Sequence, residues 1–77
     1  NPFQENTIIP IEVNVASTIY FSVFDVSGKL IFAKTIGLHV GKNYIQVDHS
    51  NLLGEGIYFY KVEGNKGTEV RKMILKY

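Results

Sequence analysis

The feature that most constrains this chain is a series of short segments in which apolar residues alternate with polar ones. A turn signal interrupts the series about every ten residues, as in all-β domains. Residues 8–15 and 19–24 carry apolar side chains at every second position, which is the period of a half-buried strand. No helical period competes with this pattern. Pro10 cannot donate to a β-ladder, so we expect the first strand to lie at a sheet edge or to carry a bulge.

Turn signals divide the rest of the chain into hairpins. Asp25-Val26-Ser27-Gly28 predicts a tight turn, because an Asp carboxylate caps such turns and Gly28 supplies a positive φ. Gly64-Asn65-Lys66-Gly67 predicts a second hairpin turn. We expect further strands at 29–35, 44–48, 56–62 and 68–75, with loops at 37–41 and 49–55.

Six or seven short strands in one small chain predict an all-β fold, an antiparallel β-sandwich. A chain of 77 residues forms one small domain that buries only about 60% of its unfolded surface. Little stability remains for a strained catalytic site. The absence of cysteine excludes a disulfide framework, a zinc knuckle and a cysteine nucleophile.

The formal charge of +1 argues against a partner bound by charge alone, nucleic acid included. Residues 1–60 carry three lysines against five carboxylates, whereas residues 61–77 carry five basic residues against two carboxylates. This pattern indicates a solvated strand face and a basic tail. The chain has no apolar run of membrane-spanning length and no signal peptide. It begins Asn1-Pro2 without an initiator methionine, so we expect a fragment of a longer protein whose N-terminal signal lies outside it.

Few residues suggest catalysis. Asp48-His49-Ser50 are adjacent, whereas a catalytic triad brings three groups together from separate elements, so we interpret them as a turn. His39 and His49 show no metal-ligand spacing. We therefore expect neither an enzyme, nor a resident metal, nor a cofactor. Calcium stays open at three oxygen-bearing residues, since such ligands leave no sharp signature: Asp25, Asp48 and Asn51.

Aromatic residues concentrate in the strand that opens at Gly56. One set of aromatic side chains in such a strand usually enters the core, and we favour that role for Tyr58, Phe59 and Tyr60. A sugar-stacking platform stays open for any tyrosine that faces outward: Tyr20, Tyr44, Tyr58 or Tyr60.

The last residues are apolar and flanked by lysines. Met73, Ile74 and Leu75 lie between Lys72 and Lys76. A partner could capture such a segment by strand addition or through its end group. The segment also fits the last strand of the sandwich, and both interpretations stay open.

Five motifs, in order along the chain, resemble those of one known family. They are Asn1-Pro2-Phe3, Thr7-Ile8-Ile9-Pro10-Ile11-Glu12-Val13, the strand from Ile19 into Asp25-Val26-Ser27-Gly28-Lys29, Leu53-Gly54-Glu55-Gly56-Ile57-Tyr58-Phe59-Tyr60, and Lys72-Met73-Ile74-Leu75-Lys76. Together they resemble the type A C-terminal sorting domains of the type IX (Por) secretion system of Bacteroidota. The third strand is generic, and the chain ends at Tyr77 rather than at the basic residue.

This resemblance implies an immunoglobulin-like β-sandwich, with residues 1–77 as a single C-terminal sorting domain of an exported protein. Its function would be a non-catalytic secretion signal. The N-terminal cargo domain would cross the inner membrane by its own signal. The outer-membrane shuttle barrel and translocon would recognise the sorting domain in the periplasm. A sortase-like C-terminal signal peptidase would then remove it, and the cargo would be secreted or attached to the cell surface.

The resemblance also implies roles for individual residues. Recognition by the translocon maps to the closing segment: Lys72, Met73, Ile74, Leu75 and Lys76. Scaffold roles map to the entry motif, the first hairpin and the start of the aromatic strand: Asn1, Pro2, Phe3, Asp25, Gly28, Gly56 and Tyr58.

Two other functions fit a small sandwich of this composition. One is a carbohydrate-binding or adhesive module attached to a secreted enzyme, which requires an exposed row of tyrosines. The other is a spacer or assembly module, like the immunoglobulin-like part of a flagellar hook-cap protein. In either case, an open edge strand would permit a homodimer.

Overall fold

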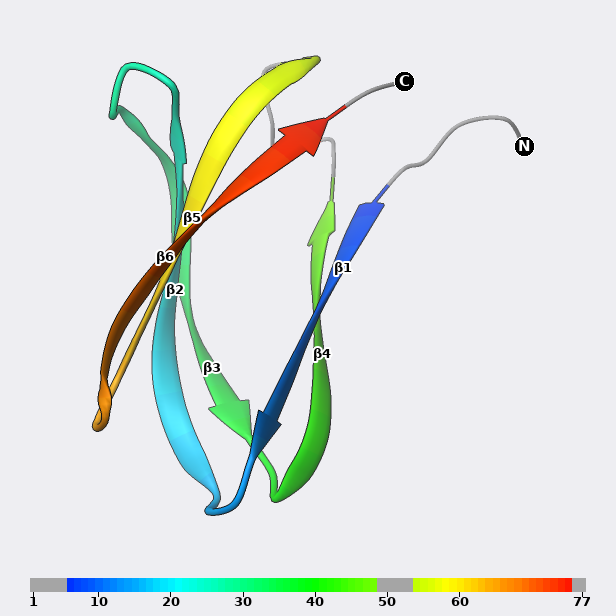
Figure 1. Cartoon of the computed structure of the whole chain (residues 1–77), viewed down its shortest axis with the longest axis vertical. Helices are drawn as coiled ribbons and strands as arrows, with labels where there is room; N and C mark the ends of the chain where they lie inside the picture. The colour runs from blue at the N-terminus through cyan, green and yellow to red at the C-terminus, as the bar shows by residue number, and fades with distance from the viewer. Residues whose placement is uncertain (1–5, 49–53, 76–77) are drawn as a thin grey trace.

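The computed structural model describes residues 6–48 and 54–75, which form six β-strands and no helix (Figure 1). The strands are β1 (Asn6–Val13), β2 (Ser17–Asp25), β3 (Leu30–Leu38), β4 (Gly41–Asp48), β5 (Gly56–Gly64) and β6 (Gly67–Leu75). None of these residues belongs to a helix long and apolar enough to span a membrane.

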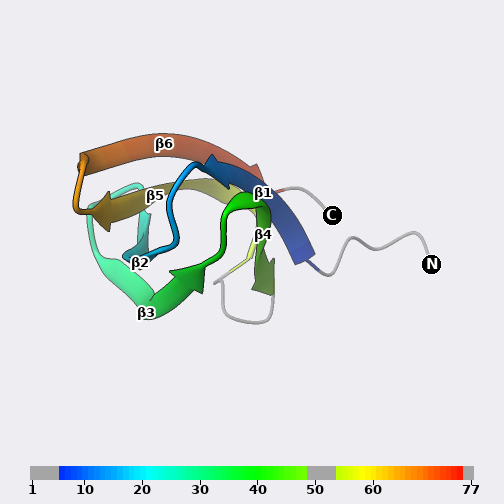
Figure 2. The same ribbon diagram turned by 90° about the horizontal axis from the view of Figure 1, so that it is seen from below.

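The strands form two antiparallel sheets. One contains β1 and β4, and the other has the order β3-β2-β5-β6. Figure 2 shows the larger sheet curving, with β1 and β4 across its concave side. The predicted small antiparallel β-sandwich is confirmed, with six strands among the described residues. The expectation for the first strand is also confirmed, since the described part of the chain pairs β1 with β4 alone.

The core lies between the sheets, as the alternation predicts. β4 is the clearest case: Asn43, Ile45 and Val47 are buried, and the residues between them are exposed. Phe21 is fully buried at the centre. Its ring centroid lies 6.3 Å from that of Phe32 and 5.8 Å from that of Tyr60. The buried apolar residues come from all six strands: Ile9, Ile19, Phe21, Val23, Leu38, Ile45, Val47, Tyr58 and Met73.

Several strand boundaries differ from the sequence prediction. The first strand ends at Val13, and Asn14 and Val15 form a bend. The loop expected at 37–41 is largely strand, because β3 continues to Leu38 and β4 begins at Gly41. The physical reason is that β3 and β4 belong to different sheets. The chain changes sheet at a corner of two residues rather than through a loop.

Both predicted hairpins are confirmed. β2 and β3 pair antiparallel, with a register irregularity between Val23 and Phe24. β5 and β6 pair from Gly56 opposite Leu75 to Gly64 opposite Gly67, which leaves Asn65 and Lys66 as the turn. The second hairpin makes β6 the direct neighbour of the aromatic strand.

Candidate recognition site

The candidate recognition segment belongs to an edge strand. β6 pairs with β5 along its whole length. Its other side has no partner among the described residues, and in Figure 1 it lies in front of β5. An edge strand presents unpaired backbone N–H and C=O groups to any approaching chain. The geometry therefore permits strand addition at β6.

The alternation of β6 divides the predicted recognition residues into two groups. Met73 is 7% exposed and lies in the core, opposite Tyr58. Ile74 is 59% exposed, and Lys72 is also exposed. Successive side chains of a strand point to opposite faces. A partner can therefore contact Lys72 and Ile74 in the folded domain, whereas the Met73 side chain packs in the core and holds β6 against it.

The two remaining recognition residues are placed less fully. The backbone of Leu75 ends β6 and pairs with Gly56. Lys76 lies outside the described residues, as does the entry motif Asn1-Pro2-Phe3. The structure thus places three of the five predicted side chains, and two of these three face solvent.

The two cations of β6 differ in their surroundings. The guanidinium of Arg71 lies 2.9 Å from Oε2 of Glu69. The hydrogen bond that it donates there is the main reason why the pKa of Arg71 lies above its ordinary value. Lys72 makes no ion pair with any residue within 6–48 or 54–75. Lys72 is therefore the unneutralised cation of the described part of β6.

Tyr58 and Gly56 set the start of the strand that carries β6. The Tyr58 hydroxyl donates a hydrogen bond of 2.7 Å to the carbonyl of Gly54, and the residue is 4% exposed. This arrangement, a tyrosine near a strand start bonded to the backbone four residues upstream, is that of the tyrosine corner in immunoglobulin-like sandwiches. Gly56 has a φ of 149°, which residues with a Cβ rarely adopt. Both residues therefore position β5, and through it β6.

Asp25 organises the turn at the same end of the sheet, where it pairs with Tyr58. Its Oδ1 accepts hydrogen bonds from the Ser27 hydroxyl (2.6 Å), the Ser27 amide (2.9 Å) and the Lys29 amide (3.0 Å). The pKa of Asp25 is lowered, chiefly by the Ser27 hydroxyl and then by the Lys29 amide. Gly28 has a φ of 90°. The structure places Asp25 and Gly28 as a hairpin scaffold.

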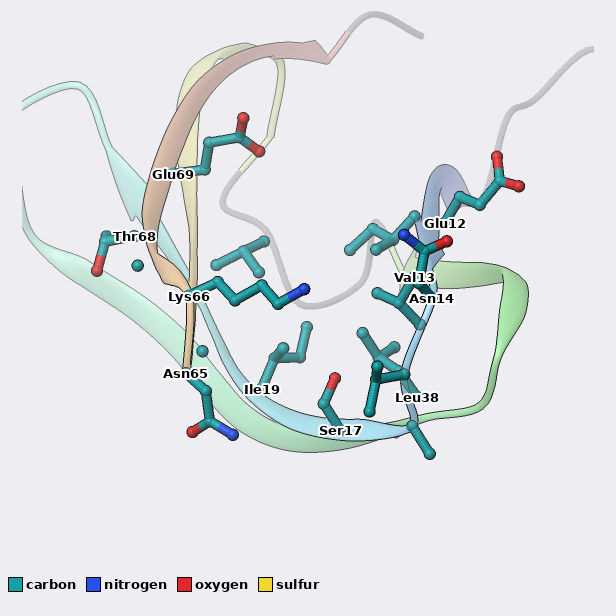
Figure 3. Close-up of a pocket in the computed structure, with 16 residues that line it drawn as sticks. Glu12, Val13, Asn14, Ser17, Ile19, Leu38, Asn65, Lys66, Thr68 and Glu69 are labelled. Atoms are coloured by element: carbon teal, nitrogen blue, oxygen red, sulfur yellow. The ribbon is translucent and has the colours of Figure 1, made fainter.

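A groove of about 550 Å³ opens between the β1–β2 connection and the β5–β6 turn (Figure 3). Ile19, Leu38 and Val62 contribute to its apolar wall. Figure 3 shows the Lys66 side chain extending across it toward Val13 and Asn14.

No three His, Cys, Asp or Glu side chains within the described ranges are grouped so as to hold a metal ion. Of the adjacent residues Asp48-His49-Ser50, the last two lie outside those ranges.

The tyrosines within the described ranges differ in exposure, and none of the sheets presents a row of them. Tyr58 is buried, and Tyr60 is half-buried against Phe21. Tyr20 and Tyr44 are 46% and 64% exposed, but they belong to different sheets. The open alternative of an outward-facing tyrosine therefore narrows to Tyr20 and Tyr44, which form no shared row and for which a sugar-binding role stays a prediction. Alternate strand residues are divided between the core and two separate outer faces.

Comparison with known proteins identifies the family. The model of the secretion system C-terminal sorting domain matches residues 1–76. The chain belongs to this family. No curated protein and no solved structure gives a significant match. The sorting domain is a C-terminal signal for type IX secretion, and it directs export to the cell surface or the outside. The family is one of sorting signals rather than of catalysts.

The sorting domain also depends on Asn43, which sequence analysis did not single out. The side chain is 7% exposed. Its Oδ1 accepts from the His39 amide at 3.0 Å, and its Nδ2 donates to the carbonyls of His39 at 2.8 Å and Gly41 at 3.2 Å. A longer bond of 3.5 Å reaches the carbonyl of Ile11 in β1. Asn43 thus fixes the corner where the chain changes sheet. The sequence does carry a sign of this role. Asn43 lies two positions before Ile45, and this spacing predicts that both side chains face the core.

Proposed function

We propose that the domain directs its cargo through the type IX outer-membrane translocon by presenting β6 as the recognised strand. The observation that carries the proposal is that β6 is an edge strand which exposes Lys72 and Ile74 and buries Met73. The shuttle barrel and the translocon contact Lys72 and Ile74 directly. Leu75 and Lys76 extend the same contact, and Met73 holds the strand in place.

The proposed order of events follows from the family. The cargo crosses the inner membrane by its N-terminal signal, and the sorting domain folds in the periplasm. The shuttle barrel and translocon then bind the folded domain. A sortase-like C-terminal signal peptidase cuts upstream of β1 and attaches the cargo to the cell surface. Asn1, Pro2 and Phe3 precede β1 and form the entry to the domain.

The free edge of β6 supports one mode of binding in particular. In strand addition, backbone hydrogen bonds supply affinity, and alternate side chains supply specificity. The side chains available for specificity at this edge include Lys72 and Ile74. The exposed apolar side chain of Ile74 and the cation of Lys72 distinguish β6 from an entirely polar edge strand. A receptor can therefore bind β6 and not bind polar edge strands of other proteins.

The test is export of a fluorescent reporter fused ahead of residues 1–77, in a Bacteroidota host with and without a working translocon. We expect reporter outside the cell only when the translocon works. Ile74→Lys and Lys72→Glu should each lower export about tenfold, the effect of losing about 1.4 kcal/mol of binding. The control is Val15→Lys, because Val15 has a similar exposure of 62% in the bend after β1. Full export of both β6 variants, or export without the translocon, would refute the proposal.

A further inference from the structure

The outer face of the four-stranded sheet is apolar well beyond β6. Met73, Tyr58 and Val23 are buried in the core, so their neighbours along each strand point away from it. We call the apolar residues on this side the outer patch. Its members come from β2, β5 and β6: Phe24, Ile57, Phe59, Val70 and Ile74.

Strand register makes the outer patch continuous. Phe24 lies opposite Phe59, and Ile57 lies opposite Ile74. Side chains directly opposite one another have Cβ atoms about 4.5–5.5 Å apart. Ile57, Val70 and Ile74 are 42%, 58% and 59% exposed. The solvated face of an antiparallel sheet is normally polar. Exposed apolar residues on β5 and β6, continued by the half-buried Phe59 and Phe24, therefore indicate a surface that another molecule covers.

Two lysines lie within the outer patch. Lys61 Nζ is 5.5 Å from the centroid of the Phe24 ring and 3.6 Å from Oε1 of Glu63. Lys72 extends the row of Phe24 and Phe59, since it lies opposite Phe59. Lys61 therefore has a partner carboxylate, whereas Lys72 has none among residues 6–48 and 54–75. The charge that this face leaves unneutralised is positive.

Ser22 shows that the centre of this face already excludes water. It lies on β2 opposite Lys61 and Ala33, on the same side of the sheet as Phe24. Ser22 is nevertheless 1% exposed, and its hydroxyl has no hydrogen-bond partner among residues 6–48 and 54–75. Native proteins rarely bury a hydroxyl without a partner. Side chains of the domain itself therefore already cover Ser22, and contact with another molecule falls to the more exposed residues around it.

We propose that the outer patch is a second part of the docking surface for the type IX receptor that binds β6. The receptor there presents an apolar surface with a carboxylate facing Lys72. This inference rests on the proposed function, because the continuity of the outer patch with β6 identifies the occupant. Ile74 belongs to both surfaces, and Lys72 of β6 lies opposite Phe59 of the outer patch. A second copy of the domain fits less well, because face-to-face packing would bury the lysines of both copies together.

The inference means that the receptor recognises the folded sheet rather than the terminal strand alone. Ile57 is the decisive residue, since it lies on β5 and contributes no backbone to the free edge of β6. Ile57→Lys should lower reporter export about tenfold in the fusion described above, comparable to Ile74→Lys. Ile57→Thr keeps a β-branched strand residue and should lower export in the same direction.

The matched control is Ile8→Lys. Ile8 is 49% exposed on β1, in the other sheet. Its export should equal that of the unchanged fusion. Thermal unfolding of each purified fusion verifies that the substituted domain remains folded. Because Ile57→Thr introduces no charge, it tests the outer patch even if Ile57→Lys prevents folding.

The outcomes separate the two proposals. A loss of export for Ile74→Lys and both Ile57 variants, with Ile8→Lys unaffected, supports the outer patch as a docking surface. A loss for Ile74→Lys with full export of both folded Ile57 variants overturns the outer patch and leaves the proposed function standing. Full export of all variants refutes the proposed function and the inference together. Ile57-dependent binding of the fusion to anionic phospholipid vesicles would overturn the assignment to a protein receptor.

Discussion

At the residue scale, a single carboxylate oxygen of Asp25 holds the turn between β2 and β3. Its Oδ1 accepts three hydrogen bonds, from the Ser27 hydroxyl and amide and from the Lys29 amide. The carbonyl of Asp25 also accepts from the Gly28 amide at 3.0 Å. All of these bonds favour the ionised carboxylate or close the turn around it. The hairpin of β2 and β3 therefore depends on the charge state of Asp25.

This dependence predicts a loss of stability in acid. The pKa of Asp25 is lowered in the folded domain, so its contribution is complete above the ordinary value of 3.8 and is lost as the pH falls through the lowered pKa. Asp25→Asn should destabilise the domain at neutral pH, and the difference from the unchanged domain should shrink in strong acid. Urea unfolding between pH 7 and pH 2 measures both quantities.

Ser27→Ala is the matched variant for the Asp25 prediction. It removes the hydroxyl that lowers the pKa of Asp25 most strongly, yet it keeps the carboxylate and the Lys29 amide bond. The loss of stability in acid should be smaller than in the unchanged domain, and it should be complete at a higher pH. A stability difference between Asp25→Asn and the unchanged domain that stays constant from pH 7 to pH 2 would contradict this explanation.

Single residues differ in how far the sequence reveals them. Asp25 and Gly28 are predictable, because their hydrogen bonds lie within a few residues of the chain. Asn43 is not, because part of its role is the contact with Ile11, which is 32 residues away. This contact can be predicted only when it is known that β1, which carries Ile11, pairs with β4, which carries Asn43.

At the element scale, β6 separates stability from recognition. Met73 lies in the core, whereas Ile74 faces solvent on the outer patch. Met73→Ala should lower the free energy of unfolding by about 2–5 kcal/mol, as a large-to-small core change does. Ile74→Ala should change it by less than about 0.5 kcal/mol. Urea unfolding of the two variants provides the comparison.

The same pair should behave differently in export. Met73→Leu keeps the core volume nearly unchanged, so the fusion should fold and leave the cell normally. Ile74→Lys should fold, but its export should be about tenfold lower, as proposed above. If Met73→Leu stopped export while its unfolding free energy stayed normal, the receptor would be reading Met73, and the division of β6 into anchor and contact residues would be wrong.

Strand positions were predictable from alternation, but strand ends at sheet changes were not. A hairpin turn and a local period predict the strands at 56–62 and 68–75 nearly to the bounds of β5 and β6. The glycines of region 37–41 predict a loop, although only His39 and Val40 of this region lie outside the strands. A transfer between sheets needs no long loop when a buried amide such as that of Asn43 holds the corner.

At the scale of the whole molecule, pairing between distant strands decides the shape. β2 pairs with β5 across two intervening strands, and β1 pairs with β4. Local patterns predict that such strands exist and that they are antiparallel, but they do not specify which strands become neighbours. The position of β6 at an edge, on which the candidate site depends, follows from this long-range pairing.

An unequal sandwich exposes several strand edges, and they differ in their capacity to pair with another chain. Pro10 interrupts the hydrogen-bond donors of β1 and so protects that strand. β6 contains no proline and exposes Val70 and Ile74. We therefore expect any homodimer to form through β6, by edge-to-edge pairing of two copies. Lys72 on each copy opposes this pairing, so the dimer should be weak and favoured by salt.

Light scattering of the purified domain over a concentration series, at low and high salt, tests this expectation. The mean mass should rise toward that of a dimer at high concentration, and more steeply at high salt. Val70→Lys should keep the domain monomeric, whereas Ile8→Lys on β1 should not. A single monomeric mass at every concentration and salt would exclude pairing through β6. If the dimer does form, it occupies the free edge that the receptor requires, so dimerisation and receptor binding should exclude one another.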